Sequence, residues 1–346
     1  MVRFLFGSVK SIVFVFNLPH LGKIAYIDDD YGYAFGGFMG MVTPKKELHP
    51  KYLFHLMTSN AYKDFIAALS DGANINNLKF DDLKKFAVPF PSLPEQQRIV
   101  GILDAAFDGI AIAKANAEKN LQNACTLFEI HLQSVFTQAP LSGVEGRGEG
   151  WVDTIIGECI RFIDYRGKTP QKTASGLRLI TAKNVKMGYV QDEPREFVAP
   201  DSYDGWMTRG IPKLGDVLFT TEAPLANVAQ LETDEKVVFA QRIIIMQPDA
   251  SRLDCTFLKY LLLSQPVQQR IHVKGTGATV QGIKASLLKL IEISFPKSIS
   301  EQQQIVAKLN ALREETQRLA SLYQRKLAAL DELKKSLLHQ AFSGVL

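Results

Sequence analysis

The sequence has little of what marks several large protein classes. Its 346 residues include three cysteines, Cys125, Cys159 and Cys255, which are spaced too widely for a disulfide framework or a zinc site. No apolar run reaches the roughly 18 residues that a membrane-spanning helix needs, and the run Ser11–Leu18 lacks the cleavage pattern of a signal peptide. The net charge of +4 is too small to indicate nucleic-acid binding by itself. We therefore expect a cytoplasmic protein with no membrane segment, no metal and no cofactor.

Signatures of catalysis are also missing. There is no phosphate-binding loop of the Walker type and no H-E-x-x-H zinc motif. Asn17-Leu18-Pro19-His20 differs at its second residue from the Asn-Pro-Pro-aromatic motif of amino-methyltransferases, and no glycine-rich cofactor loop precedes it. Pro200-Asp201 with Asp234-Glu235-Lys236 fits a nuclease-like pattern that is too loose to indicate a nuclease. We expect no catalytic residues in this chain.

An internal repeat dominates what the sequence does contain. Glu95–Val100 reads almost identically to Glu301–Val306, at an offset of 206 residues, and matching apolar positions follow. Upstream the match continues at offsets of 205 and then 204, the last of which places Val13 on Val217. The chain therefore consists of two tandem units, each a domain followed by a long segment with helical periodicity.

The long segment of each unit has the periodicity of a coiled coil, sustained over about five heptads. Two core helices of a single globular domain are the alternative, but such helices are rarely so long. We expect the two helices to pair through Ile99, Leu103, Ala106 and Ile110 of the first and Leu309, Leu312, Leu319, Tyr323 and Leu330 of the second. The same register puts Leu127, His131, Lys326 and Leu333 on the seam.

The two domains are unequal. Nothing before Val13 corresponds to the stretch from Trp151 to Gly215, so the first domain is expected to lack its N-terminal half. The predicted fold is α+β, with two domains of mixed helix and sheet, the first incomplete, joined by two long helices. The expected bounds are 1–90 for the partial domain, 91–137 for the first helix, 138–150 for a glycine-rich linker, 151–297 for the second domain and 298–346 for the second helix. Apolar runs in the second domain predict strands at 155–163, 177–180, 216–220, 237–239, 243–246 and 291–295 and a helix at 257–263.

Basic and polar residues gather in the second domain. Residues 161–186 hold seven basic residues against one acid, and the loops 220–224 and 275–282 are polar. Such a surface attracts phosphates, and its arginines and asparagine suit base edges in a DNA groove. A solvated basic face and ordinary turns explain the same residues equally well. The candidate DNA-binding residues are Arg166, Lys168, Arg178, Lys183, Asn184, Thr221, Thr276 and Lys284.

At these motifs the chain resembles a known family. Trp151-Val152, Asp164–Pro170, Gly215–Phe219 and a Pro-x-x-x-x-Glu-Gln-Gln-x-Ile-Val helix, in a duplicated order of domain and helix, are similar to the DNA specificity subunit of type I restriction-modification systems. The resemblance covers essentially the whole chain. It implies two target recognition domains that each read half of a split DNA sequence, separated by two helices that pair antiparallel and act as a ruler.

The resemblance also implies the function and the partners. It predicts a non-catalytic subunit that recognises a bipartite target in double-stranded DNA and directs two modification subunits to it, with restriction subunits joining through the assembled complex. The shortened first domain departs from the family pattern and predicts recognition of one half-site only. The alternative is a structural adaptor, or a defective specificity subunit, whose helices bind partner subunits without full target recognition. An enzyme acting alone is a third and more distant reading.

The incomplete first domain also predicts an exposed surface. The loss of neighbouring strands should leave an edge strand uncovered around Ser11–Phe16, with apolar surface beneath it. Self-association through this surface, or completion by another polypeptide that carries the missing piece, would cover it. We expect a dimer or a poorly soluble first domain when the chain is alone.

Overall fold

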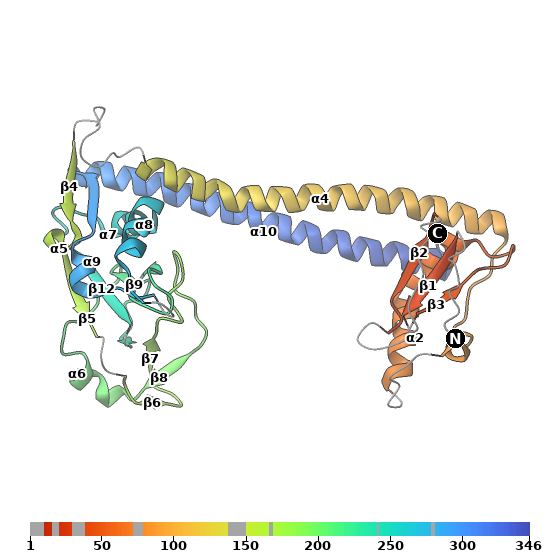
Figure 1. Ribbon diagram of the computed structural model, residues 1–346, viewed down its shortest axis with the longest axis horizontal. Coiled ribbons are helices and arrows are strands. Elements are labelled where there is room, and N and C mark those ends of the chain that lie inside the picture. Colours follow the sequence, from red (N-terminus) through yellow and green to blue (C-terminus); the bar gives the residue numbers. More distant parts are fainter. Residues whose placement is uncertain are drawn as a thin grey trace. The chain divides into compact units, whose positions relative to one another are not determined.

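The computed structural model forms two compact units (Figure 1). Unit 1 consists of Met1–Asn123 and Leu319–Leu346, and unit 2 of Ala124–Arg318. The residues that the structure describes are 10–15, 21–29, 39–71, 79–137, 150–165, 169–240, 242–277 and 281–346. None of the helices in these ranges combines the length and hydrophobicity that crossing a bilayer requires.

Unit 1 contains a small antiparallel sheet covered by helices. Its strands, in the spatial order β2-β1-β3, are β1 (Ser11–Val15), β2 (Ile24–Ile27) and β3 (Met39–Val42). Its helices are α1 (Pro50–Thr58), α2 (Asn60–Asp71) and the short α3 (Phe80–Leu83). Ile12 and Phe14 point from β1 into the same core as Met57, Tyr62 and Ile66. This alternation along β1 follows from the two-residue period of a strand.

The expected edge strand lies at the centre of this sheet. β1 pairs with β2 on one side and with β3 on the other, and Ile12 and Phe14 are almost fully buried. The prediction of an uncovered edge at Ser11–Phe16 is therefore wrong for residues 11–15, and Phe16 lies outside the described residues. The edges of the described sheet are β2 and β3.

Unit 2 has a larger sheet with both faces buried. Its strands are β4 (Trp151–Ile155), β5 (Ile160–Asp164), β6 (Lys172–Thr173), β7 (Leu177–Ile180), β8 (Glu196–Val198), β9 (Val217–Thr220), β10 (Val228–Gln230), β11 (Val238–Phe239), β12 (Ile243–Pro248) and β13 (Glu292–Pro296). Its shorter helices are α5 (Ile156–Cys159), η1 (Pro200–Ser202), α6 (Tyr203–Trp206), α7 (Cys255–Leu263), α8 (Gln265–Lys274) and α9 (Ala285–Lys289). The predicted strand at 155–163 is two strands, because α5 turns the chain between β4 and β5.

The central sheet of unit 2 has the order β10-β9-β12-β5. Val217 and Phe219 of β9 pack with the α7 side, whereas Leu218 packs with a second sheet of order β11-β7-β8-β6. Successive side chains of a strand point to opposite faces, so two separate cores lie on either side of the sheet. β4 pairs with β13 in a separate two-stranded ladder.

The two long helices are α4 (Leu93–Thr137) and α10 (Ile299–Ser343). In unit 1, Ile99 and Leu103 of α4 share a core with Leu338 and Ala341 of α10, and Lys114 pairs with Asp331. The partner number in α10 falls as the number in α4 rises, so the helices run antiparallel, as the family resemblance implied.

The seam between the helices follows the expected residues only in part. Ile99, Leu103, Ile110 and Leu309 are buried, and Ala106, Leu312, Leu319, Tyr323 and Leu330 are half-buried. Leu127, His131, Lys326 and Leu333 are exposed, so the strict seven-residue register is wrong at these positions. A straight helix drifts by about 20° per heptad from that register, and Phe128, Leu132 and Leu338 take their places in the cores.

A buried glutamine connects each long helix to the domain before it. In unit 1, the Gln96 side chain accepts a hydrogen bond from the His49 amide (2.7 Å) and donates to the carbonyls of Glu47 (3.0 Å) and Pro91 (2.9 Å). In unit 2, Gln302 makes the equivalent bonds to Asp254 (2.8 Å), Arg252 (2.9 Å) and Pro296 (2.7 Å). Both glutamines are 0% exposed. The first glutamine of the repeated Glu-Gln-Gln therefore acts as a clamp, because its side chain binds three backbone groups at the start of the helix.

Two further contacts repeat between the units. Tyr52 of α1 meets Phe342 edge-on, with ring centroids 5.2 Å apart, and Phe257 of α7 meets Phe136 in the same way at 5.5 Å. In unit 1, His55 of α1 contacts the Asp104 carboxylate of α4 at 2.8 Å. At the equivalent position of unit 2, Tyr260 of α7 donates to the Asn310 side chain of α10 at 2.5 Å. Burial lowers the pKa of His55, while the Asp104 carboxylate opposes that shift. Each unit thus fixes its helices to its domain by the same three contacts.

Removal of the glutamine clamp should loosen the junction between domain and helix. We expect Gln96→Ala to destabilise unit 1 by roughly 3 kcal/mol, because two carbonyls and one amide lose their partners in a buried place. Gln97→Ala, on the exposed face of the same helical turn, is the matched control and should change little. Hydrogen exchange of the His49 amide measures the effect; equal exchange in the two variants would contradict the clamp.

Candidate nucleic-acid interface

The loops at one end of the central sheet of unit 2 converge. The loop after β9 is bound to the segment before α9, because the Ile283 amide donates to the Thr221 carbonyl at 2.9 Å and Glu222 forms a β-bridge with Gly282. Arg242, directly before β12, contacts the Glu222 carboxylate at 3.0 Å. Residues 220–224, 242 and 276–284 therefore form one cluster, of which 278–280 lie outside the described residues.

The backbone of this cluster is strained. Ala223 and Arg242 of the cluster, and Ala226 two residues beyond it, have φ values of 48°, 78° and 66°, in the left-handed region that residues other than glycine seldom adopt. Such conformations cost energy and are concentrated at binding and catalytic sites. The strain supports a functional role for these loops.

The cluster contains three of the predicted DNA-binding residues, with different exposure. Thr276 and Lys284 are exposed. Thr221 is only 3% exposed, and its hydroxyl faces the Arg242 carbonyl at 3.4 Å. Its side chain is therefore not accessible to DNA in this conformation, and its contact with DNA stays a prediction.

The basic stretch 161–186 separates into structural and accessible residues. Asn184 is 0% exposed; its side chain accepts from the Thr181 amide (3.0 Å) and donates to the carbonyls of Gln191 (3.1 Å) and Pro194 (3.0 Å). It holds the loop before β8 together and is not accessible to a base in this conformation, so its contact with DNA stays a prediction. Lys183 beside it is exposed.

Arg178 has a mixed environment. Its guanidinium contacts the Asp192 carboxylate at 3.0 Å and donates to the Asp192 carbonyl at 3.1 Å, and its side chain keeps 32% exposure. It therefore stabilises the same loop and retains an accessible edge. Arg166 and Lys168 lie outside the described residues.

Arg242 is the accessible cation of the loop cluster that the sequence did not reveal. Its side chain is 45% exposed and held by Glu222 through Nε, which orients the guanidinium. No charge cluster surrounds it in the sequence. Among the described residues, no group of histidine, cysteine or acidic side chains is arranged to hold a metal ion.

A second cationic feature lies between α7 and α10. Lys259 is 5% exposed, and burial, followed by the charge of Arg313, lowers its pKa to about 8. Arg313 in turn donates to the Gly188 carbonyl at 3.0 Å, which connects α10 to the loop before β8. Burial of Lys259 and the neighbouring charge of Arg313 both disfavour the charged lysine, so this pair of cations opposes folding.

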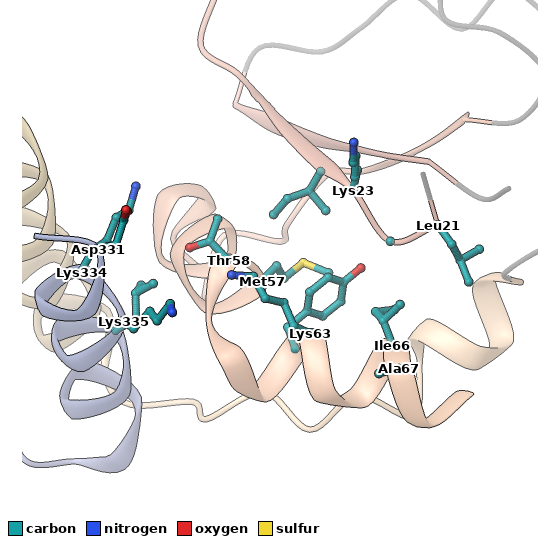
Figure 2. Close-up of a pocket in the computed structure, with 14 residues that line it drawn as sticks. Leu21, Lys23, Met57, Thr58, Lys63, Ile66, Ala67, Asp331, Lys334 and Lys335 are labelled. Atoms are coloured by element: carbon teal, nitrogen blue, oxygen red, sulfur yellow. The ribbon is translucent and has the colours of Figure 1, made fainter. Parts of the chain in front are cut away.

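Unit 1 holds a pocket of about 640 Å³ (Figure 2). Lys334 and Lys335 of α10 lie across it from Met57 of α1 and Lys63 of α2. Tyr62 also lines the pocket, and its buried hydroxyl has no hydrogen-bond partner in the described part of the chain. An apolar floor with lysines at its rim suits an anionic group attached to an apolar body.

The comparisons with known proteins agree with this architecture. The sequence profile of the family described as "Type I restriction modification DNA specificity domain" matches residues 7–123 and 210–324. These matches cover more than half of the chain, which therefore belongs to the type I restriction-modification DNA specificity family. It is a specificity subunit and not a catalytic one.

Curated relatives and solved structures are similar over most of their length. The chain is 23% identical to the type I restriction enzyme StySPI specificity subunit of Salmonella potsdam and to the EcoKI specificity subunit of Escherichia coli K12; each match covers 94% of this chain and 72% of the relative. A structure of the HsdS subunit from Thermoanaerobacter tengcongensis aligns with a TM-score of 0.67 at 21% identity, over 99% of this chain and 82% of that one. A chain from a study of type I complex assembly aligns with a TM-score of 0.76 at 21% identity, over 97% and 82%.

Two adjacent residues separate DNA contact from loop structure. We expect Lys183→Ala to weaken DNA binding of the assembled complex for all sequences alike and to flatten its salt dependence, as loss of a phosphate contact does. Asn184→Ala should instead destabilise the loop by roughly 1–3 kcal/mol, because two carbonyls and an amide lose their partners. Salt titration of DNA binding and urea unfolding measure the two effects; unchanged affinity in Lys183→Ala at every salt concentration would remove Lys183 from the interface.

Burial of Lys259 should make the free energy of unfolding depend on pH. Below its folded pKa of about 8, Lys259 is charged in both states and its burial opposes folding, whereas above its unfolded pKa it is neutral in both. We expect Lys259→Met to raise the free energy of unfolding at pH 7 by on the order of 2 kcal/mol and to lose that advantage as the pH rises above 8. Lys308→Met, at an exposed position of α10, is the control and should not change the pH dependence of the free energy of unfolding. If this free energy varied with pH in the same way in both variants, the burial of Lys259 would not be the cause.

Proposed function

We propose that this chain recognises a split target in double-stranded DNA and directs modification and restriction subunits to it. The observation that carries the proposal is the duplication: two domains, each clamped by a buried glutamine to a long helix, with the helices antiparallel in the family of DNA specificity subunits. Two reading domains in one chain suit a target with two halves.

In unit 2 we place the reading surface on the strained loop cluster and the basic stretch. The accessible residues there are Arg242, Thr276, Lys284, Lys183 and the exposed edge of Arg178. Arg166 and Lys168 remain part of the proposal on sequence grounds. The terminal nitrogens of an arginine that is held through Nε are the ones that make the bidentate contact with guanine.

The long helices are proposed to bind the modification subunits, one for each repeated unit. Several large apolar side chains on them are exposed, among them Ile112 (65%), Ile130 (62%) and Leu333 (47%). Apolar side chains on an exposed helix face support protein docking. The same observation favours the second candidate function, an adaptor that binds partner subunits without reading the full target.

Mapping of modified bases across the genome tests the function. Cells that express the modification subunit with this chain should carry modification at one defined motif that is absent without the chain. Arg242→Ala should relax one position of the motif, at a cost of about 1–3 kcal/mol in discrimination, while Lys308→Ala, an exposed cation on α10, should leave the motif unchanged. A complex that assembles but leaves no modified motif would favour the adaptor.

A further inference from the structure

The pocket of about 640 Å³ in unit 1 lies where the corresponding residues of unit 2 pack into one core. The helices of the two units can be compared position by position. α1 and α7 correspond at an offset of 205 residues, α2 and α8 begin at the same offset, and α4 and α10 correspond at an offset of 206. The helix residues that line the pocket therefore have identifiable counterparts in unit 2.

In unit 2 these counterparts pack around an aromatic side chain. Phe128 of α4 packs against the core that contains Val267 and Ile271 of α8. Its ring centroid lies 6.1 Å from that of Tyr260 of α7. Leu263, the last residue of α7, belongs to the same core. The long helix and the two domain helices of unit 2 therefore share one apolar core.

In unit 1 the same positions belong to two separate cores. Met57 of α1 and Ile66 of α2 belong to the core beneath the small sheet, whereas Leu338 of α10 belongs to the core that α10 shares with α4. Lys334 of α10 has the position of Phe128. All four unit 1 residues line the pocket. The pocket therefore marks the place where α10 and the domain helices of unit 1 do not pack directly.

Two further differences between the units widen this space. Thr58 has the position of Leu263 and is shorter. Lys63 has the position of Gln268, whose side-chain amide in unit 2 donates to two backbone carbonyls, at 3.0 and 2.6 Å. Lys63 is exposed instead. The pocket therefore follows from the identity of particular side chains on α1, α2 and α10.

The rim of the pocket is positively charged (Figure 2). Its charged residues are Lys23, Lys63, Asp331, Lys334 and Lys335. The Asp331 carboxylate is already paired with Lys114 of α4, and Lys335 forms an exposed pair with Glu332. The Lys334 ammonium lies 4.7 Å from the centroid of the Phe107 ring. Lysine ammonium groups attract phosphate and carboxylate groups, so the rim favours an anion above an apolar floor.

We propose that this pocket binds a small organic anion, an apolar ring that carries a phosphate or carboxylate group. The ring would take the place that the Phe128 ring has in unit 2, against Met57, Ile66 and Leu338, with the anionic group at the lysine rim. The pocket volume of about 640 Å³ is within the range of small-molecule sites, roughly 300–1,000 Å³. A nucleotide base fits less well, because its polar edges would lose water against an apolar floor.

The bound anion would add a connection between α10 and the domain helices of unit 1. In unit 2, Phe128 makes this connection permanently. In unit 1 the connection would depend on the concentration of the ligand, because a ligand that binds only the folded state stabilises it by mass action. Binding should therefore be visible as protection of the helices on both sides of the pocket.

The test uses the full chain and naphthyl phosphate as the probe, with naphthol and inorganic phosphate as the two halves of the probe. We expect saturable one-to-one binding of naphthyl phosphate in calorimetry, slower hydrogen exchange at residues 57–67 and 331–338, and much weaker binding of either half. Absence of binding, or equal affinity for naphthol, would overturn the proposal. Since no DNA is present, failure of this test leaves the proposed function in place.

Matched variants place the binding in the pocket. Thr58→Leu, Lys63→Gln and Lys334→Phe together introduce the side chains of unit 2 and should abolish binding, whereas Lys326→Phe, at an exposed position of α10 outside the pocket, should not. Lys63→Gln alone changes one exposed side chain and should weaken binding about threefold, as the loss of one exposed ion pair does. Equal affinity of the triple variant and Lys326→Phe would overturn the proposal. So would tighter binding of an acetylated Phe-Glu-Glu peptide than of naphthyl phosphate, because a protein segment would then be the occupant.

Discussion

The structure depends on a buried amide side chain that holds three backbone groups at the start of each long helix. A glutamine at this position satisfies a donor and two acceptors from three different segments, which water cannot reach. A buried carbonyl without a partner is costly, so the chain before the helix, the loop before α1 or α7 and the helix itself must stay together. A second attachment is the aromatic contact between each domain and the C-terminal end of a long helix. Tyr52 of α1 meets Phe342 of α10, and Phe257 of α7 meets Phe136 of α4.

Because the same contacts recur in both units, the repeat could predict the architecture from the sequence. The helices begin at Leu93 and Ile299, close to the expected starts, and apolar periodicity is a sufficient guide to their pairing where Leu103 and Leu309 lie. The register failed farther along, at His131 and Lys326, because heptad counting assumes a supercoil period that these helices do not keep. Periodicity predicts that the helices pair, but the rotation of the contact face along each helix depends on how the two helices pack.

The candidate site was less accessible to prediction. Composition placed Lys183 and Lys284 on an accessible surface, but it could not separate Lys183 from its neighbour Asn184, whose side chain fills a loop. Asparagine suits a base edge and a loop carbonyl equally well, so only the fold decides. Arg242 was missed because no cluster of charges surrounds it in the sequence, and its place beside Glu222 depends on the fold.

The two cores of unit 2 show how recognition can vary while assembly stays constant. The core on the α7 side includes Phe136 and Leu309 of the long helices, whereas the core on the other face is built by the second sheet. The family profile begins at residue 210 in the second unit and at residue 7 in the first, so it covers the part that the units share. Substitutions in the second sheet change the far face of the central sheet and leave the glutamine clamp untouched. The half-domain on that face of unit 2 can therefore differ in sequence without any change in how the helices are held.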